Sequence, residues 1–170
     1  LSRIHLLVSS MCEDLLNCME SPNEDILRDI IEREIEVDKF YLLGVRQLKA
    51  AIQSREAAAK LQVPSNIHCL GYRIVIKSIE RVGDHIENVS RNVLELSGSK
   101  DYLRLARQLR KYGEGVYYVY AKAIKSLFKE SGQLAEEAIR DAVQTESLRP
   151  ELIKAALKSS PDVAMRIGSI

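Results

Sequence analysis

Several features are missing from this sequence, and each absence narrows what the chain can be. No apolar run approaches the roughly 20 residues that a membrane-spanning helix requires. No signal peptide pattern is present either, because the apolar start meets charge again by Glu13. The 25 lysine and arginine residues are balanced by 24 aspartate and glutamate residues, so no overall field favours nucleic acid or an anionic membrane. We therefore expect a cytoplasmic protein without membrane insertion.

Cysteine and recognisable catalytic motifs are also scarce. The three cysteines, Cys12, Cys18 and Cys69, form no Cys-x-x-Cys pair, which favours reduced core or boundary residues of an intracellular protein. No Ser-His-Asp set, phosphate-cradling glycine-rich loop or cysteine nucleophile can be identified. The chain starts on leucine rather than methionine, and we expect it to be a fragment of a longer protein.

Long stretches with helical spacing of apolar residues dominate what is present. The pattern predicts helices over 1–19, from Asn23 to about Ala59, and from Asn66 to about Leu96, separated by short turn sequences. Three long helices joined by short turns form an antiparallel bundle. The sequence therefore predicts an all-α fold, with a first three-helix domain over residues 1–98.

The remainder of the chain repeats the same pattern of helices and turns. Helices are predicted over 101–129, 133–146 and 151–158, and a last one opens at Pro161. The spacing of Pro64, Ile67 and Gly71 recurs at Pro161, Ala164 and Gly168, 97 residues later. Residues 99–170 are therefore predicted to be a second three-helix repeat that is incomplete.

The second predicted helix carries acidic residues where apolar ones are expected. Its seam positions follow steps of four and three residues, and two of them are acidic: Leu27, Ile31, Glu34, Asp38, Tyr41, Val45, Leu48 and Ile52. Glu34 and Asp38 lie one turn apart on one face. Unpaired buried carboxylates are costly, so this pair needs protonation, basic partners or a cation.

The same Glu-x-x-x-Asp spacing recurs at Glu80–Asp84, followed directly by His85, and at Glu137–Asp141. Antiparallel helices would bring Glu34, Asp38, Glu80 and Asp84 to one cation site, with His85 as a further candidate ligand. The alternative is a solvated pair, because Glu80 and Asp84 lie roughly opposite the apolar stripe of their helix. Glu137 and Asp141 lack a second acidic helix, and we expect them to be solvated.

A family resemblance bears on this choice. The segment KSIERVGDHIENV at 77–89 resembles the signature helix of the PhoU phosphate-signalling proteins, and the Glu34–Asp38 helix resembles its partner. Residues 45–49 resemble the archaeal branch, in which PhoU repeats often follow an AbrB-type DNA-binding domain. The resemblance implies a non-enzymatic regulator that restrains phosphate uptake by acting on a phosphate transporter and its sensor kinase. DNA would be contacted only through a domain outside this chain, and a homodimer is a further option.

The resemblance also implies that the paired acidic helices bind a metal ion cluster. Carboxylates with little nitrogen and no thiolate suit Fe, Mn, Mg or Ca, with Fe favoured and Zn still open. One alternative is a carboxylate-bridged di-metal enzyme, although its Glu-x-x-His spacing is missing because Gly83 stands three residues after Glu80. The other is a helical interaction or structural module with solvated acids.

Overall fold

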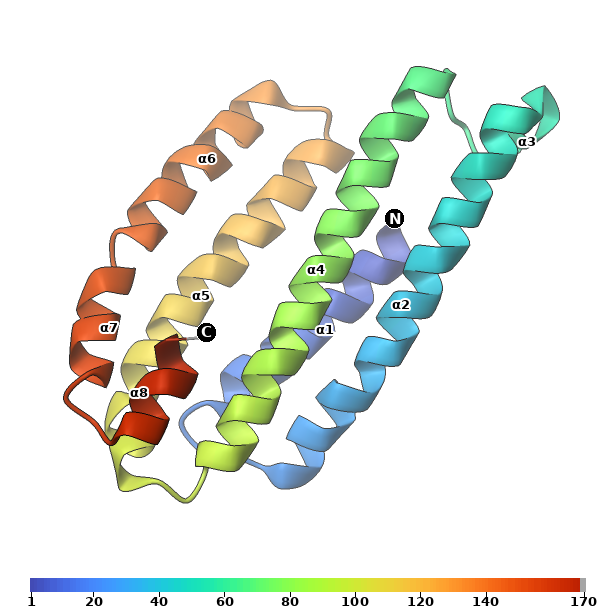
Figure 1. Cartoon of the computed structure of the whole chain (residues 1–170). Helices are drawn as coiled ribbons and strands as arrows, with labels where there is room; N and C mark the ends of the chain where they lie inside the picture. The colour runs from blue at the N-terminus through green and yellow to red at the C-terminus, as the bar shows by residue number, and fades with distance from the viewer. Residues whose placement is uncertain (169–170) are drawn as a thin grey trace.

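A computed structural model of the protein describes residues 1–168, and within that range all regular structure is helical. This confirms the predicted all-α class. The eight helices, labelled in Figure 1, are α1 Ser2–Cys18, α2 Glu24–Gln53, α3 Arg55–Lys60, α4 Asn66–Leu96, α5 Lys100–Phe128, α6 Gly132–Glu146, α7 Arg149–Ala156 and α8 Pro161–Gly168. No helix of the described part is long and apolar enough to cross a membrane.

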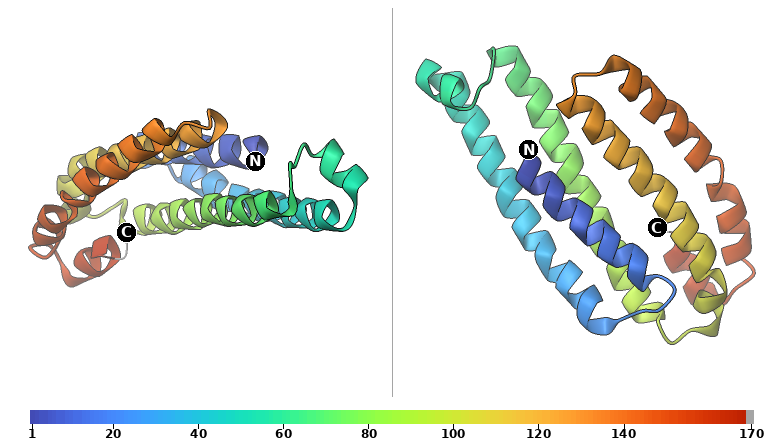
Figure 2. Two further views of the ribbon diagram at one scale, coloured as in Figure 1. Left: turned by 90° about the horizontal axis from the view of Figure 1, so that it is seen from above. Right: turned by 180° about the vertical axis from the view of Figure 1, so that it is seen from behind.

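The first part of the chain forms a three-helix bundle of α1, α2 and α4. The helices α2 and α4 run antiparallel side by side, and α1 lies across both of them (Figure 2, right). Residues of α1 at helical spacing face these two helices and are almost fully buried: Ile4, Val8, Met11 and Leu15. Burial of this stripe against two helices stabilises the bundle.

The ends of α2 follow from local side-chain chemistry. The side chain of Asn23 accepts hydrogen bonds from the backbone N–H groups of Asp25 and Ile26, which caps the helix. The predicted continuation to Ala59 is wrong, because Ser54 has extended backbone angles and separates α2 from α3. Its hydroxyl accepts from the N–H of Ala57, so a serine that caps the next helix interrupts the longer one.

The buried face of α2 is rotated from the predicted seam. Its buried residues are Leu27, Ile30, Val37 and Ala51, whereas Asp38 is exposed and Ile52 is 50% exposed. Two glycines explain the rotation, because they let α2 and α4 approach closely. A Cβ atom on Gly44 would lie 2.1 Å from Ile76 Cδ1, and one on Gly83 would lie 3.0 Å from Val37 Cγ1.

Helix α4 is buried on two faces. The predicted apolar stripe is present, with Ile79, Ile86, Val93 and Leu96 buried. A second face, made of Ile76, Glu80, Gly83 and Ser90, is also buried, and Gly44 and Val37 of α2 lie against it. The alternative that Glu80 is solvated is therefore wrong, because α2 covers the side of α4 that the periodicity assigned to solvent.

The second half of the chain continues from α4 through α5, which packs on α1. The hydroxyl of Tyr102 donates to the carbonyl of Met19 at 2.6 Å, and His5 Nδ1 lies 3.1 Å from the hydroxyl of Tyr120. Helix α6 packs along α5, and α8 returns to α4, where Arg166 forms an ion pair with Glu95. The apolar stripe of α5 is buried at Leu105 but 46% exposed at Val116.

Candidate metal centre

Three carboxylates converge on the surface between α2 and α4. Glu34 and Asp38 extend from successive turns of α2, and Asp84 extends from α4 opposite them. One oxygen atom of each side chain lies within 4.8 Å of the others. We call Glu34, Asp38 and Asp84 the acidic cluster.

A close contact between a valine side chain of α2 and a glycine of α4 lies beside the acidic cluster and determines its register. Val37 precedes Asp38, and Gly83 precedes Asp84, and the side chain of Val37 lies against Gly83. A larger residue at position 83 would separate the helices at this level, and the two aspartates would move apart with them. The acidic cluster therefore depends on a close packing contact that contains no acidic residue.

The acidic cluster carries unbalanced negative charge. Burial raises the pKa of Glu34, and the nearby carboxylates of Asp38 and Asp84 raise it further. Burial and the charge of Glu80 likewise raise the pKa of Asp84, with a smaller opposing effect of the Lys77 ammonium. Like charges held close together favour protonation, and a bound cation would remove this repulsion.

Two of the five predicted site residues lie outside the acidic cluster. Glu80 is 5% exposed, and both of its carboxylate oxygens accept hydrogen bonds from Lys77 Nζ. His85 is exposed on α4 and does not join the cluster. The sequence contained a signal for the Lys77–Glu80 contact, since residues three apart face each other on a helix, but nothing in the sequence indicated that Glu80 is buried.

Comparison with known proteins agrees with this architecture. The family model described as the PhoU domain matches residues 1–93, which include α1, α2, α4 and the acidic cluster. The chain belongs to the PhoU family. This family regulates phosphate uptake and is non-enzymatic. No curated protein and no solved structure matches the chain.

Outside the PhoU domain match, the third Glu-x-x-x-Asp pair has a different environment. Lys122 of α5 donates a hydrogen bond to Asp141 Oδ2, and its Nζ lies 3.8 Å from Glu137 Oε2. The same Nζ lies 4.8 Å from the centre of the Tyr118 ring. Glu137 and Asp141 are therefore half-buried and paired with a lysine of the neighbouring helix, rather than fully solvated as expected.

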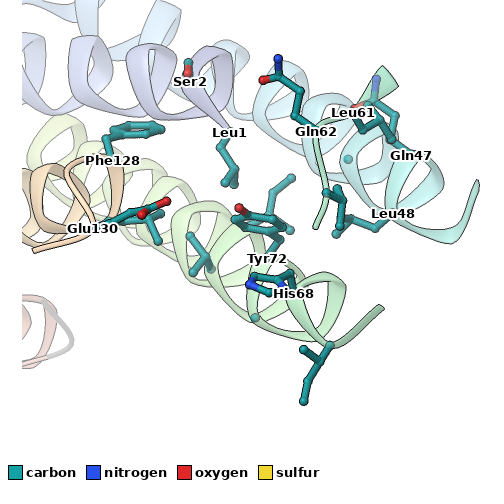
Figure 3. Close-up of a pocket in the computed structure, with 17 residues that line it drawn as sticks. Leu1, Ser2, Gln47, Leu48, Leu61, Gln62, His68, Tyr72, Phe128 and Glu130 are labelled. Atoms are coloured by element: carbon teal, nitrogen blue, oxygen red, sulfur yellow. The ribbon is translucent and has the colours of Figure 1, made fainter. Parts of the chain in front are cut away.

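A separate hollow lies at the other end of the PhoU bundle. It has a volume of about 870 Å³ and lies where α1 begins, between the end of α2, the start of α4 and the turn after α5. Leu1, Tyr72 and Phe128 project into it (Figure 3). Its lining contains no residue of the acidic cluster, so the hollow is not part of the candidate metal centre.

The acidic cluster has the donor chemistry of a hard-cation site. Carboxylate oxygens are the preferred ligands of Ca, Mg and Mn and are common ligands of Fe. Three of them from two helices, close together and carrying excess negative charge, fit such a cation. Asp38 and Asp84 are exposed, so an ion there would be reached from solvent.

Proposed function

We propose that this chain is a metal-binding regulator of phosphate uptake that acts in the cytoplasm on a phosphate transporter and its sensor kinase, without catalysing a reaction. The observation that carries the proposal is the convergence of Glu34, Asp38 and Asp84 within a PhoU domain. The proposal also includes a domain division: residues 99–170 form a second, truncated PhoU-like repeat, with its boundary near residue 98.

The acidic cluster would act by holding a cation between two helices. Glu34 and Asp38 would bind it from α2 and Asp84 from α4, with iron as the favoured metal. The cation supplies positive charge that offsets the repulsion among the carboxylates and links the helices. Because Asp38 and Asp84 are exposed, the surface around the bound cation would be accessible to a protein partner.

The di-metal enzyme alternative gains no support. Such enzymes use a Glu-x-x-His spacing on facing helices of the bundle, and Gly83 occupies the histidine position after Glu80. His85 does not join the acidic cluster, which lies at the protein surface. We therefore propose a regulatory role for the site.

The metal-binding part of the proposal is tested by elemental analysis and thermal melting. The protein as purified should contain Fe or Mn, and adding Fe, Mn, Zn or Mg at neutral pH should raise its melting temperature, because the ion binds the folded state. The double variant Asp38→Asn plus Asp84→Asn should lose this effect. A matched control, Glu32→Gln plus Glu36→Gln, removes two charges of α2 outside the acidic cluster and should retain it.

The regulatory part needs a cellular measurement. Cells that depend on the full-length protein should restrain phosphate uptake in phosphate-rich medium, and the Asp38→Asn plus Asp84→Asn variant should take up more phosphate. Equal uptake in parent and variant would rule out a role of the acidic cluster in regulation. Unchanged melting in the presence of every metal would rule out the metal site itself.

A further inference from the structure

A lysine of α4 forms an ion pair with Glu80, which lies one turn before Asp84 of the acidic cluster. Lys77 lies one turn before Glu80 on α4, and its ammonium donates to both carboxylate oxygens of that residue. The side chain of Glu80 is only 7% exposed, whereas that of Lys77 is 36% exposed. Glu80 is thus a buried carboxylate whose counter-ion comes from the bundle surface.

The ammonium of Lys77 has a second partner across the helix interface. Lys77 Nζ lies 5.2 Å from the centre of the Tyr41 ring, whose face adds a second attraction for the cation. Glu80 and Tyr41 therefore hold the Lys77 ammonium in place between α4 and α2.

A tethered ammonium and a metal ion compete at such a site. An ammonium that occupies both oxygens of Glu80 prevents them from binding a metal. The pair Glu137–Asp141 illustrates the extreme case, because Lys122 there interacts with both carboxylates. Lys77 interacts with one carboxylate and leaves the acidic cluster open.

We propose that Lys77 sets the metal affinity of the acidic cluster by holding the carboxylate of Glu80 and so withholding it as a fourth oxygen donor. This inference rests on the proposed metal-binding function. Lys77 thereby lowers the metal affinity of the site. With the lysine in place, the fraction of protein that holds a cation changes with the metal concentration. Without it, Glu80 becomes a ligand and the cation is held more tightly.

The test is calorimetric titration of the protein with Mn²⁺ at neutral pH, with thermal melting as a second readout. Lys77→Gln should bind Mn²⁺ about tenfold more tightly than the parent, the lower end of what a change beside the ligands does to metal affinity. Lys77→Gln plus Glu80→Gln should lose most of this gain. Lys77→Arg keeps the charge and should bind like the parent.

A matched control separates the local effect from the change in net charge. Lys39→Gln removes a lysine that pairs with Glu36 at the same spacing on the surface of α2, and Mn²⁺ affinity should change little because exposed charges are screened. Circular dichroism of each variant checks that the helices are retained.

The possible outcomes are distinguishable. If the parent binds Mn²⁺ and Lys77→Gln binds no more tightly, the role of Lys77 is refuted while the proposed metal site stands. If Lys77→Gln binds and the parent does not, the lysine blocks the site and the inference is supported. If neither binds Mn²⁺, Fe²⁺, Zn²⁺ or Mg²⁺, the proposed metal site fails and the inference fails with it.

Discussion

Two helices carry acidic pairs with identical spacing, Glu34–Asp38 on α2 and Glu137–Asp141 on α6, and they face different neighbours. The first pair meets Asp84 of α4, so three carboxylates share one surface. The second pair meets Lys122 of α5, which forms ion pairs with both members. Each pair lies on a helix that packs antiparallel against a long neighbouring helix (Figure 1).

The comparison shows that the neighbouring helix decides the chemistry of a Glu-x-x-x-Asp pair. A third carboxylate creates a site with excess negative charge, to which a cation can bind. At the second pair, Lys122 supplies one positive charge from within the chain and offsets half of the negative charge. The spacing brings two acids together on one face in both cases, and only the residue across the helix interface differs.

The largest expected effect comes from breaking the packing beside the first pair. Gly83→Val would place side-chain atoms in the space of Val37, because even a Cβ lies 3.0 Å from Val37 Cγ1. We expect a loss of about 1–3 kcal/mol in the free energy of unfolding, as for other overpacked cores, and loss of metal-induced stabilisation. Denaturant titration measures the free energy of unfolding, and thermal melting with and without metal measures the metal-induced stabilisation.

Gly71→Val is the control for this change. Gly71 lies on the same helix with open space around its Cβ position, so the substitution should leave both stability and metal response nearly unchanged. Equal losses for the two variants would show that helix propensity, not the α2–α4 contact, is responsible.

A second prediction converts the first pair into a copy of the second. Asp84→Lys places an ammonium opposite Glu34 and Asp38, as Lys122 lies opposite Glu137 and Asp141. The metal-free protein should become more stable by up to about 1 kcal/mol, the range of exposed ion pairs, and added metal should no longer raise the melting temperature. A variant that still responds to metal would mean that Asp84 is not a ligand.

The third prediction uses pH to measure the repulsion within the acidic cluster. The pKa values of Glu34 and Asp84 are raised in the folded state. Their contribution to stability is therefore fully present below the unfolded value of about 4 and is lost as pH rises through the raised values. Metal-free Asp84→Asn should exceed the parent in stability at pH 7, and this advantage should shrink toward pH 4 in denaturant titrations. An advantage that does not vary with pH would contradict it.

The smallest effect concerns the contact that joins the two halves. Burial lowers the pKa of His5, which lies against Tyr120 of α5. The stability it contributes is present above the unfolded value of about 6.5 and is lost as pH falls through the lowered value. His5→Gln should cost about 1 kcal/mol or less at pH 7 and should remove part of the stability change between pH 7 and 5. An unaltered pH profile would exclude His5 as its source.

Much of the helical framework is predictable from local sequence, and the exceptions are instructive. The extent of α4 and the α1 stripe from Ile4 to Leu15 agree with their apolar spacing. The end of α2 could have been recognised at Ser54, a good N-cap residue before Glu56. The burial of Glu80 could not be recognised from the sequence. Helix α4 is covered on two sides, and the periodicity of one helix does not reveal a second neighbouring helix.

The sequence by itself determined where the helices form and which acids share a face, because the helical repeat and the caps act over a few residues. Only the tertiary structure decided that Glu34 and Asp38 meet Asp84 while Glu137 and Asp141 meet Lys122. Those partners lie on other helices, and their approach depends on how each helix is rotated. For α2 and α4 that rotation follows from the close contacts at Gly44 and Gly83, where the absence of a side chain leaves room for Ile76 and Val37 of the facing helix.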